Sequence, residues 1–131
     1  MAYRIASVQR DPLPSKASAP IKRKDYLSWL HELPCAVTGK QPVQAAHLST
    51  AALEYGALGR GKGRKVSDRF CLPLSEEEHH RQHSMRELDY WRQVGINPYV
   101  VALALFGLWS DMGDDATPYA VMVLNWHRRA G

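Results

Sequence analysis

Apolar residues recur along this 131-residue chain with periods that predict short helices and short strands. Residues 22–32 carry apolar side chains at helical spacing, and Pro34 should end the helix that they predict. Two apolar runs, 35–37 and 43–48, flank a turn-forming Thr-Gly-Lys segment and predict a compact hairpin. Residues 70–74 predict a further short strand.

The second half of the chain predicts consecutive helices. Ser75 is a typical N-cap because three glutamates follow it in the first turn, and this helix should extend to about Ser84. Further helices are expected over 86–94 and over 97–109, where Asn-Pro forms the start. A polar break then precedes residues 118–129, whose apolar run does not decide their structure.

The apolar side chains of these helices form the expected core. They are Leu88, Trp91, Val94, Val100, Leu103, Leu105 and Leu108. The helix that includes Tyr99 is apolar nearly all round, so we expect it to be buried or to lie in an oligomer contact, such as a homodimer.

The length fits one domain with a modest core, and the elements predict a small α+β fold. We expect an N-terminal arm over residues 1–20, a main domain over 21–110, and a C-terminal extension of undetermined structure over 111–131.

The start of the chain has no apolar run and therefore no secretory signal. Residues 99–109 are too short to cross a bilayer, and two cysteines are too few for a disulfide framework. These features predict a cytoplasmic protein without a membrane partner.

Positive charge is concentrated in a long loop over residues 49–67 and just beyond it. The net charge of +4 already favours a polyanionic partner, and five basic residues fall within ten positions. They are Arg60, Lys62, Arg64, Lys65 and Arg69. Interspersed glycines suit phosphate contacts that do not depend on base sequence, and they predict a loop that is mobile without nucleic acid. The alternative is a solvated loop without a ligand. The loop nearly fits a nucleotide-binding pattern, but Gly63 stands where that pattern requires Ser or Thr.

Four of the six histidines lie in two short segments on either side of this loop. His79 and His83 are four residues apart, so on a helix they share one face and could hold one metal ion. His80 points about 100° away from them. His47 follows a predicted strand, and a third imidazole near such a pair could accept a proton. In the alternative interpretation these histidines cap the helix or are merely solvated.

The order of these parts resembles the HNH, or ββα-metal, endonucleases, specifically a phage and prophage subgroup that includes recombination-enhancement-function-like nucleases. The resemblance covers about residues 26–108. It is carried by Leu33-Pro34-Cys35-Ala36-Val37-Thr38-Gly39, Ala46-His47-Leu48, Lys65-Val66-Ser67-Asp68-Arg69, Leu72-Pro73-Leu74-Ser75, His79, Gln82-His83, Tyr90-Trp91 and Gly95-Ile96-Asn97-Pro98.

The resemblance implies a ββα-metal core with flanking helices and a metal-dependent hydrolysis of DNA phosphodiester bonds. In this comparison His47 matches the general base, and His79 and His83 match the helical metal ligands. Asp68 falls near the position where the family has an Asn or Asp that orients the loop or the catalytic histidine. One divalent ion is implied, and Mg²⁺, Mn²⁺, Zn²⁺ and Ni²⁺ all remain open.

The chain departs from the family at two places. Ala46 stands where many members have an additional ligand, so His47 is either the base or itself a ligand, and we favour the base. Many relatives also hold a structural zinc with two Cys-x-x-Cys-like pairs, of which only Cys35 is kept here; Thr38, Ser75 and Glu78 replace the other three ligands. Because a structural zinc needs four soft or borderline ligands, we expect it to have been lost.

Two other functions fit the same sequence features. The chain could be a non-catalytic nucleic-acid-binding protein that keeps the HNH fold, or an interaction module whose histidines bind metal only to stabilise the fold.

Overall fold

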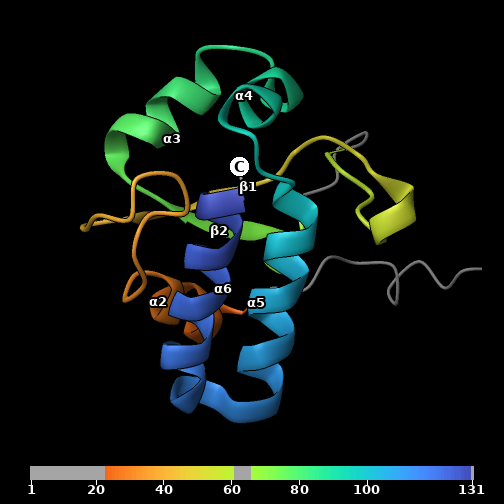
Figure 1. The fold of residues 1–131 in the computed structure, drawn as a ribbon. Coiled ribbons are helices and arrows are strands. Elements are labelled where there is room, and N and C mark those ends of the chain that lie inside the picture. The colour runs from red at the N-terminus through yellow and green to blue at the C-terminus, as the bar shows by residue number, and fades with distance from the viewer. Residues whose placement is uncertain (1–22, 61–65, 131) are drawn as a thin grey trace, which may run out of the picture.

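The computed structural model describes residues 23–60 and 66–130 of the chain. It is a mixed fold in which helices surround a small two-stranded sheet (Figure 1). The elements in chain order are α2 (Lys24–Leu30), β1 (Gln44–His47), the 3₁₀ turn η1 (Leu53–Tyr55), β2 (Cys71–Leu74), α3 (Glu76–His83), α4 (Glu87–Val94), α5 (Pro98–Met112), the 3₁₀ turn η2 (Gly113–Ala116) and α6 (Thr117–Ala130).

The sheet pairs β1 with β2 in antiparallel register, so that His47 lies opposite Cys71 and Gln44 opposite Leu74. The predicted hairpin between residues 35–37 and 43–48 is therefore wrong, because the strand partner comes from beyond the long loop. Residues 35–40 instead form a closed turn, in which the Gly39 amide donates to the Cys35 carbonyl at 2.8 Å. Gly39 has a φ of 76°, which favours glycine and suits a turn better than a strand.

The helix boundaries in the second half agree closely with the sequence predictions. The Ser75 hydroxyl accepts from the Glu78 amide at 3.3 Å, and the Asn97 side chain accepts from the amides that begin α5. Gly95 ends α4 in the left-handed conformation, with a φ of 77°. Helix α5 continues to Met112, three residues past the predicted end at Trp109.

Residues 118–129, which the sequence left undecided, belong to helix α6. This helix lies beside α5 and runs in the opposite direction (Figure 1). Ala120 and Leu124 are buried against the same core, and the Trp29 indole donates to the Thr117 hydroxyl at 2.9 Å. The predicted boundary at residue 110 falls inside α5, and α6 completes the core that α2 and α5 begin.

Of the predicted core positions, Trp91 and Leu105 are fully buried, whereas Leu88 and Val100 are more than one-third exposed. The core prediction is wrong for these two side chains. Leu88 lines an open pocket, and Val100 lies in the first turn of α5 with its side chain partly open to solvent. Among the described residues, no single helix is long and apolar enough to cross a membrane. Within this part of the chain, only the pair formed by α4 and Pro98–Arg129, whose two members are bent by 85° relative to each other, has the length and composition for a span.

Candidate functional site

Helix α3 brings the two predicted metal-binding histidines together. The Nε2 atoms of His79 and His83 lie 3.1 Å apart, and their ring centroids are separated by 4.7 Å. The Ser75 cap fixes the start of this helix. Because residues four positions apart on a helix lie on one face, the two rings lie on the same side of α3. His83 is exposed and His79 half-buried, which leaves the pair open to a ligand from solvent.

Gln44 of β1 orients the His79 ring from the opposite side. The Gln44 Oε1 atom lies 2.7 Å from Nδ1 of His79. Because a carbonyl oxygen can only accept, Nδ1 carries the proton and Nε2 keeps its lone pair. This arrangement, in which an outer group fixes the ring tautomer, is typical of metal-binding histidines. Sequence reasoning missed Gln44, since its role depends on how α3 packs against β1.

The pKa of His79 lies below its ordinary value. Burial of the ring contributes most to this decrease, followed by the neighbouring imidazoles of His83 and His47. A lower pKa favours the neutral ring, which is the form that binds a metal ion.

The donor geometry can be compared with that of a metal-bound pair. Two ring nitrogens at about 2.1 Å from one ion lie roughly 3.0–3.4 Å apart at octahedral or tetrahedral angles. The observed 3.1 Å between the His79 and His83 nitrogens falls within this range. Within the described parts of the chain, no set of three or more His, Cys, Asp or Glu side chains is arranged to hold an ion. The pair therefore fits two ligands of an open coordination shell.

His47, at the end of β1, is held by Asp68. The His47 Nε2 atom lies 2.8 Å from Oδ1 of Asp68, and the other carboxylate oxygen accepts from the Arg23 amide at 2.7 Å. Asp68 is buried, so both carboxylate oxygens are tightly placed. When Nε2 donates to Asp68, the lone pair of neutral His47 lies on Nδ1. Asp68 thus lies where it can orient His47, the residue that the resemblance suggested as the general base.

The chain directly after His47 is anchored to α4. The Glu87 carboxylate accepts from the Ser49 amide at 3.0 Å and from the Thr50 amide at 2.8 Å. It also accepts from the side chain of buried Gln82, at 3.4 Å. Glu87 was not singled out in the sequence, because a glutamate in the first turn of a helix ordinarily needs no other explanation.

Two of the five basic residues predicted to bind phosphate lie in the described part of the chain. Arg60 is exposed, and its amide donates to the Ser49 carbonyl at 2.9 Å, which places its backbone close to the end of β1. The Arg69 guanidinium lies over the Phe70 ring, 5.2 Å from its centroid. Lys62, Arg64 and Lys65 lie outside the described residues.

Comparison with known families gives a match over residues 14–105, to a family described as protein of unknown function (DUF968). The chain belongs to this family. No curated protein and no solved structure matches the chain significantly. The part matched to DUF968 contains the four histidines and Asp68, and it ends within α5, so α6 lies beyond it.

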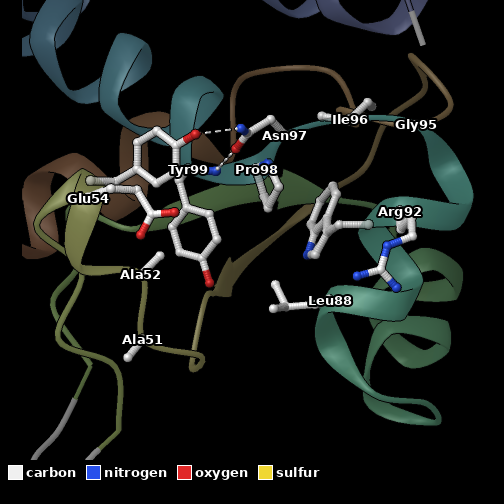
Figure 2. A pocket seen from close by; sticks show the side chains of 12 residues that line it. Ala51, Ala52, Glu54, Leu88, Arg92, Gly95, Ile96, Asn97, Pro98 and Tyr99 are labelled. Carbon is white, nitrogen blue, oxygen red and sulfur yellow. Dashed lines mark hydrogen bonds between the residues drawn. The ribbon is translucent and has the colours of Figure 1, made fainter.

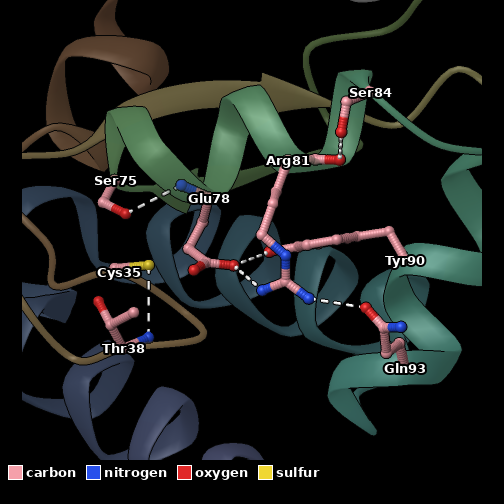
Figure 3. A network of polar contacts seen from close by, with 8 residues as sticks. All are labelled: Cys35, Thr38, Ser75, Glu78, Arg81, Ser84, Tyr90 and Gln93. Atoms are coloured by element: carbon pink, nitrogen blue, oxygen red, sulfur yellow. Dashed lines mark hydrogen bonds and ion pairs between the residues drawn. The ribbon is translucent and has the colours of Figure 1, made fainter.

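The four positions compared with a structural zinc site, Cys35, Thr38, Ser75 and Glu78, lie close together at the start of α3 (Figure 3). Burial raises the pKa of the Cys35 thiol. Hydrogen bonds from Thr38, Ser75 and Val37 lower it by more, so the pKa lies below its ordinary value. Its Sγ atom accepts from the Thr38 amide at 3.4 Å. A single thiol beside two hydroxyls is a poor zinc donor set.

Glu78 is used differently within this cluster. Its Oε1 atom accepts from the Tyr90 hydroxyl at 2.7 Å and from the Arg81 guanidinium at 2.9 Å (Figure 3). Arg81 in turn donates to Gln93 at 2.7 Å. Burial and the bond to Glu78 raise the pKa of Tyr90, so its hydroxyl remains a donor. The network therefore joins α3 to α4 through side-chain hydrogen bonds and an ion pair.

A pocket of about 520 Å³ lies between the 51–54 segment and α4, with Leu88 and Arg92 on the far side (Figure 2). None of the four histidines lines it. Tyr99 connects it to the site, because its hydroxyl donates to the Thr50 carbonyl at 2.7 Å. Burial raises the pKa of Tyr99 to about 12, which keeps that donor protonated.

Proposed function

We propose that this chain is a divalent-metal-dependent endonuclease of the HNH, or ββα-metal, type that hydrolyses DNA phosphodiester bonds and derives from a phage or prophage. The 3.1 Å separation of the His79 and His83 Nε2 atoms carries the proposal, because it matches two ligands of one ion. Gln44 supports it by leaving the Nε2 lone pair of His79 free for a ligand.

The order of the elements supports the same assignment. β1 ends in the proposed base, β2 returns antiparallel to it, and α3 follows β2 at once with the proposed metal ligands. This is the arrangement that the resemblance to ββα-metal nucleases implies, once β2 rather than residues 35–37 is taken as the second strand.

In the proposed reaction His47 accepts a proton from water at Nδ1 while the water oxygen attacks phosphorus. A new P–O bond forms, and the bond to one ester oxygen breaks. Asp68 holds the His47 ring and stabilises the imidazolium that results. A divalent ion held by His79 and His83 would supply positive charge for the phosphoryl and departing oxygens. Arg60, close to the end of β1, would contact the DNA backbone.

The experiment that tests this function is incubation of supercoiled plasmid and single-stranded DNA with the full chain and a panel of divalent ions. We expect nicking that requires an ion and stops with chelator. His79→Ala should abolish it, whereas His80→Ala should not, because His80 is exposed on another side of α3. Lack of cleavage with every ion, or a fully active His79→Ala variant, would overturn the proposal.

The same panel separates the two rival functions when cleavage is absent. Salt-dependent DNA binding without nicking would indicate a non-catalytic binder that keeps this fold. A melting temperature lowered by chelator, without DNA binding, would indicate a module that binds metal only for stability.

A further inference from the structure

Helix α6 exposes large apolar side chains that the core of one chain does not use. Tyr119 is 50% exposed, Met122 66% and Trp126 70%. The opposite side of the helix buries Ala120 and Leu124. Tyrosine, tryptophan and methionine are the residues that protein interfaces favour, and adjacent exposed apolar residues of this size are uncommon on a surface that stays in water.

These side chains belong to a regular stripe with charged ends. Asp115, in η2 just before the helix, precedes Tyr119 by four residues, and Arg129 follows Trp126 by three. The five positions are spaced by four, three, four and three residues along the sequence. The four positions within α6 follow the repeat with which paired helices bury one seam, and Asp115 lies in the 3₁₀ turn that precedes them. Asp115 and Arg129 are both exposed.

Reversing the stripe about Met122 exchanges its two charged ends and nearly exchanges Tyr119 with Trp126, which lie three residues before and four residues after Met122. Asp115 lies seven residues before Met122, and Arg129 lies seven residues after it. Two antiparallel copies related by a two-fold axis at Met122 would therefore place each Asp115 opposite the partner's Arg129 and each Tyr119 near the partner's Trp126. A parallel pair would instead place like charges together, which is unfavourable.

The adjacent arginine does not compete for this role. Arg128 turns inward, where its guanidinium donates to the Cys35 carbonyl at 3.0 Å and also contacts Asn125. Arg129 is the basic side chain left at the exposed end of the stripe.

From these observations we infer that α6 is the contact surface of an antiparallel, two-fold symmetric dimer of this chain. The occupant is a second copy because the stripe is complementary to itself in both apolar contacts and charge. The inference is independent of the nuclease proposal, since it depends on no residue of the histidine site.

Sedimentation velocity of the full chain, from low micromolar to sub-millimolar concentration, tests the interface. We expect a species with twice the mass of one chain. Met122→Asp places two like charges at the axis and should give monomers with an unchanged helical spectrum. Leu53→Asp alters a leucine that is 72% exposed in η1 and should leave the dimer intact. A monomeric unaltered chain, or a dimer that survives Met122→Asp, would overturn the inference.

Charge reversal tests the antiparallel arrangement itself. Asp115→Arg and Arg129→Asp should each weaken dimerisation about tenfold, because every substitution turns two symmetry-related pairs repulsive. The double variant restores opposite charges and should recover most of the affinity. If the two losses simply add, Asp115 does not face Arg129 and the arrangement is wrong.

Discussion

Helix α3 carries polar side chains on two sides, one buried in the protein and the other more open to solvent. On the inner side, Glu78 is nearly excluded from solvent, and its carboxylate is bonded to the Tyr90 hydroxyl and the Arg81 guanidinium. On the outer side, His79 and His83 direct their Nε2 atoms at each other across 3.1 Å. The Glu78 carboxylate thus has its hydrogen-bond partners within the protein, whereas the two imidazole nitrogens face each other on the more exposed side.

The difference indicates a folding role for Glu78 and, under the proposed function, a metal-binding role for the histidine pair. A buried carboxylate must be satisfied for the chain to fold, and Glu78 is satisfied by partners from the same two helices. Two neutral imidazoles gain at most one N–H···N bond from facing each other, and Gln44 already binds the other nitrogen of His79. Such a pair gains far more from a cation between the rings. Substitutions on the two sides should therefore affect different properties.

The largest expected effect concerns His47, the proposed general base, which Asp68 holds at the end of β1. We expect His47→Ala to lower DNA cleavage by about 10²–10⁴-fold, the usual size of a general-base contribution, and to leave metal affinity almost unchanged. Cleavage rates and calorimetric metal titration measure the two effects. A loss of metal binding as large as that of His79→Ala would show that His47 is a ligand instead.

The sequence was informative about α3 because the features that define it are local. The Ser75 cap and the four-residue spacing of the histidines act within one helix, so the pair could be predicted without tertiary structure. The caps at Gly95 and Asn97 are local in the same sense. Asp68 aligns only loosely with the motif of the ββα-metal nucleases, yet its Oδ1 atom lies 2.8 Å from Nε2 of His47.

Features that depend on long-range packing escaped sequence analysis. The pairing of β1 with β2 spans the loop between them, and the local turn at residues 35–40 gave a misleading hairpin signal. Gln44 and Glu87 have no distinctive neighbours in the sequence, and their roles appear only when α3 and α4 pack near β1. The apolar residues 119–124 are consecutive, so this run by itself does not distinguish a helix packed against α5 from a strand.

Glu78→Ala should affect stability while sparing the metal site. Removing the carboxylate leaves the buried Tyr90 hydroxyl without its acceptor, so we expect the free energy of unfolding to fall by about 1–3 kcal/mol. Metal affinity should stay within twofold of the unaltered chain. Chemical denaturation and calorimetry measure these quantities, and Glu77→Ala, at an exposed neighbouring position, is the matched control. Weaker metal binding in the Glu78 variant alone would mean that the two sides of α3 are coupled.

Gln44→Ala tests the outer contact that fixes the His79 tautomer. We expect metal affinity to fall by about tenfold, the lower end of the range for groups that orient a metal ligand. The free energy of unfolding should change little, because Gln44 is exposed. Gln44→Glu keeps an acceptor at the same place and should retain most of the affinity. If Gln44→Ala binds metal normally, the contact to His79 does not position the ring.

The smallest expected effect concerns Arg60, which extends the outer site toward the DNA backbone. Its amide donates to the Ser49 carbonyl, which places it near the end of β1, and its side chain is exposed to solvent. We expect Arg60→Ala to weaken DNA binding a few-fold and to reduce the salt slope by about 0.9, the value for one lost duplex phosphate contact. The loss should be equal on two duplexes of unrelated sequence, since phosphate contacts position the protein without reading bases. Arg86→Ala removes another exposed arginine, at the N-cap of α4, and should leave the slope unchanged if the contact is specific to the loop. Equal slopes for the Arg60 variant and the unaltered chain would remove Arg60 from the phosphate-binding surface.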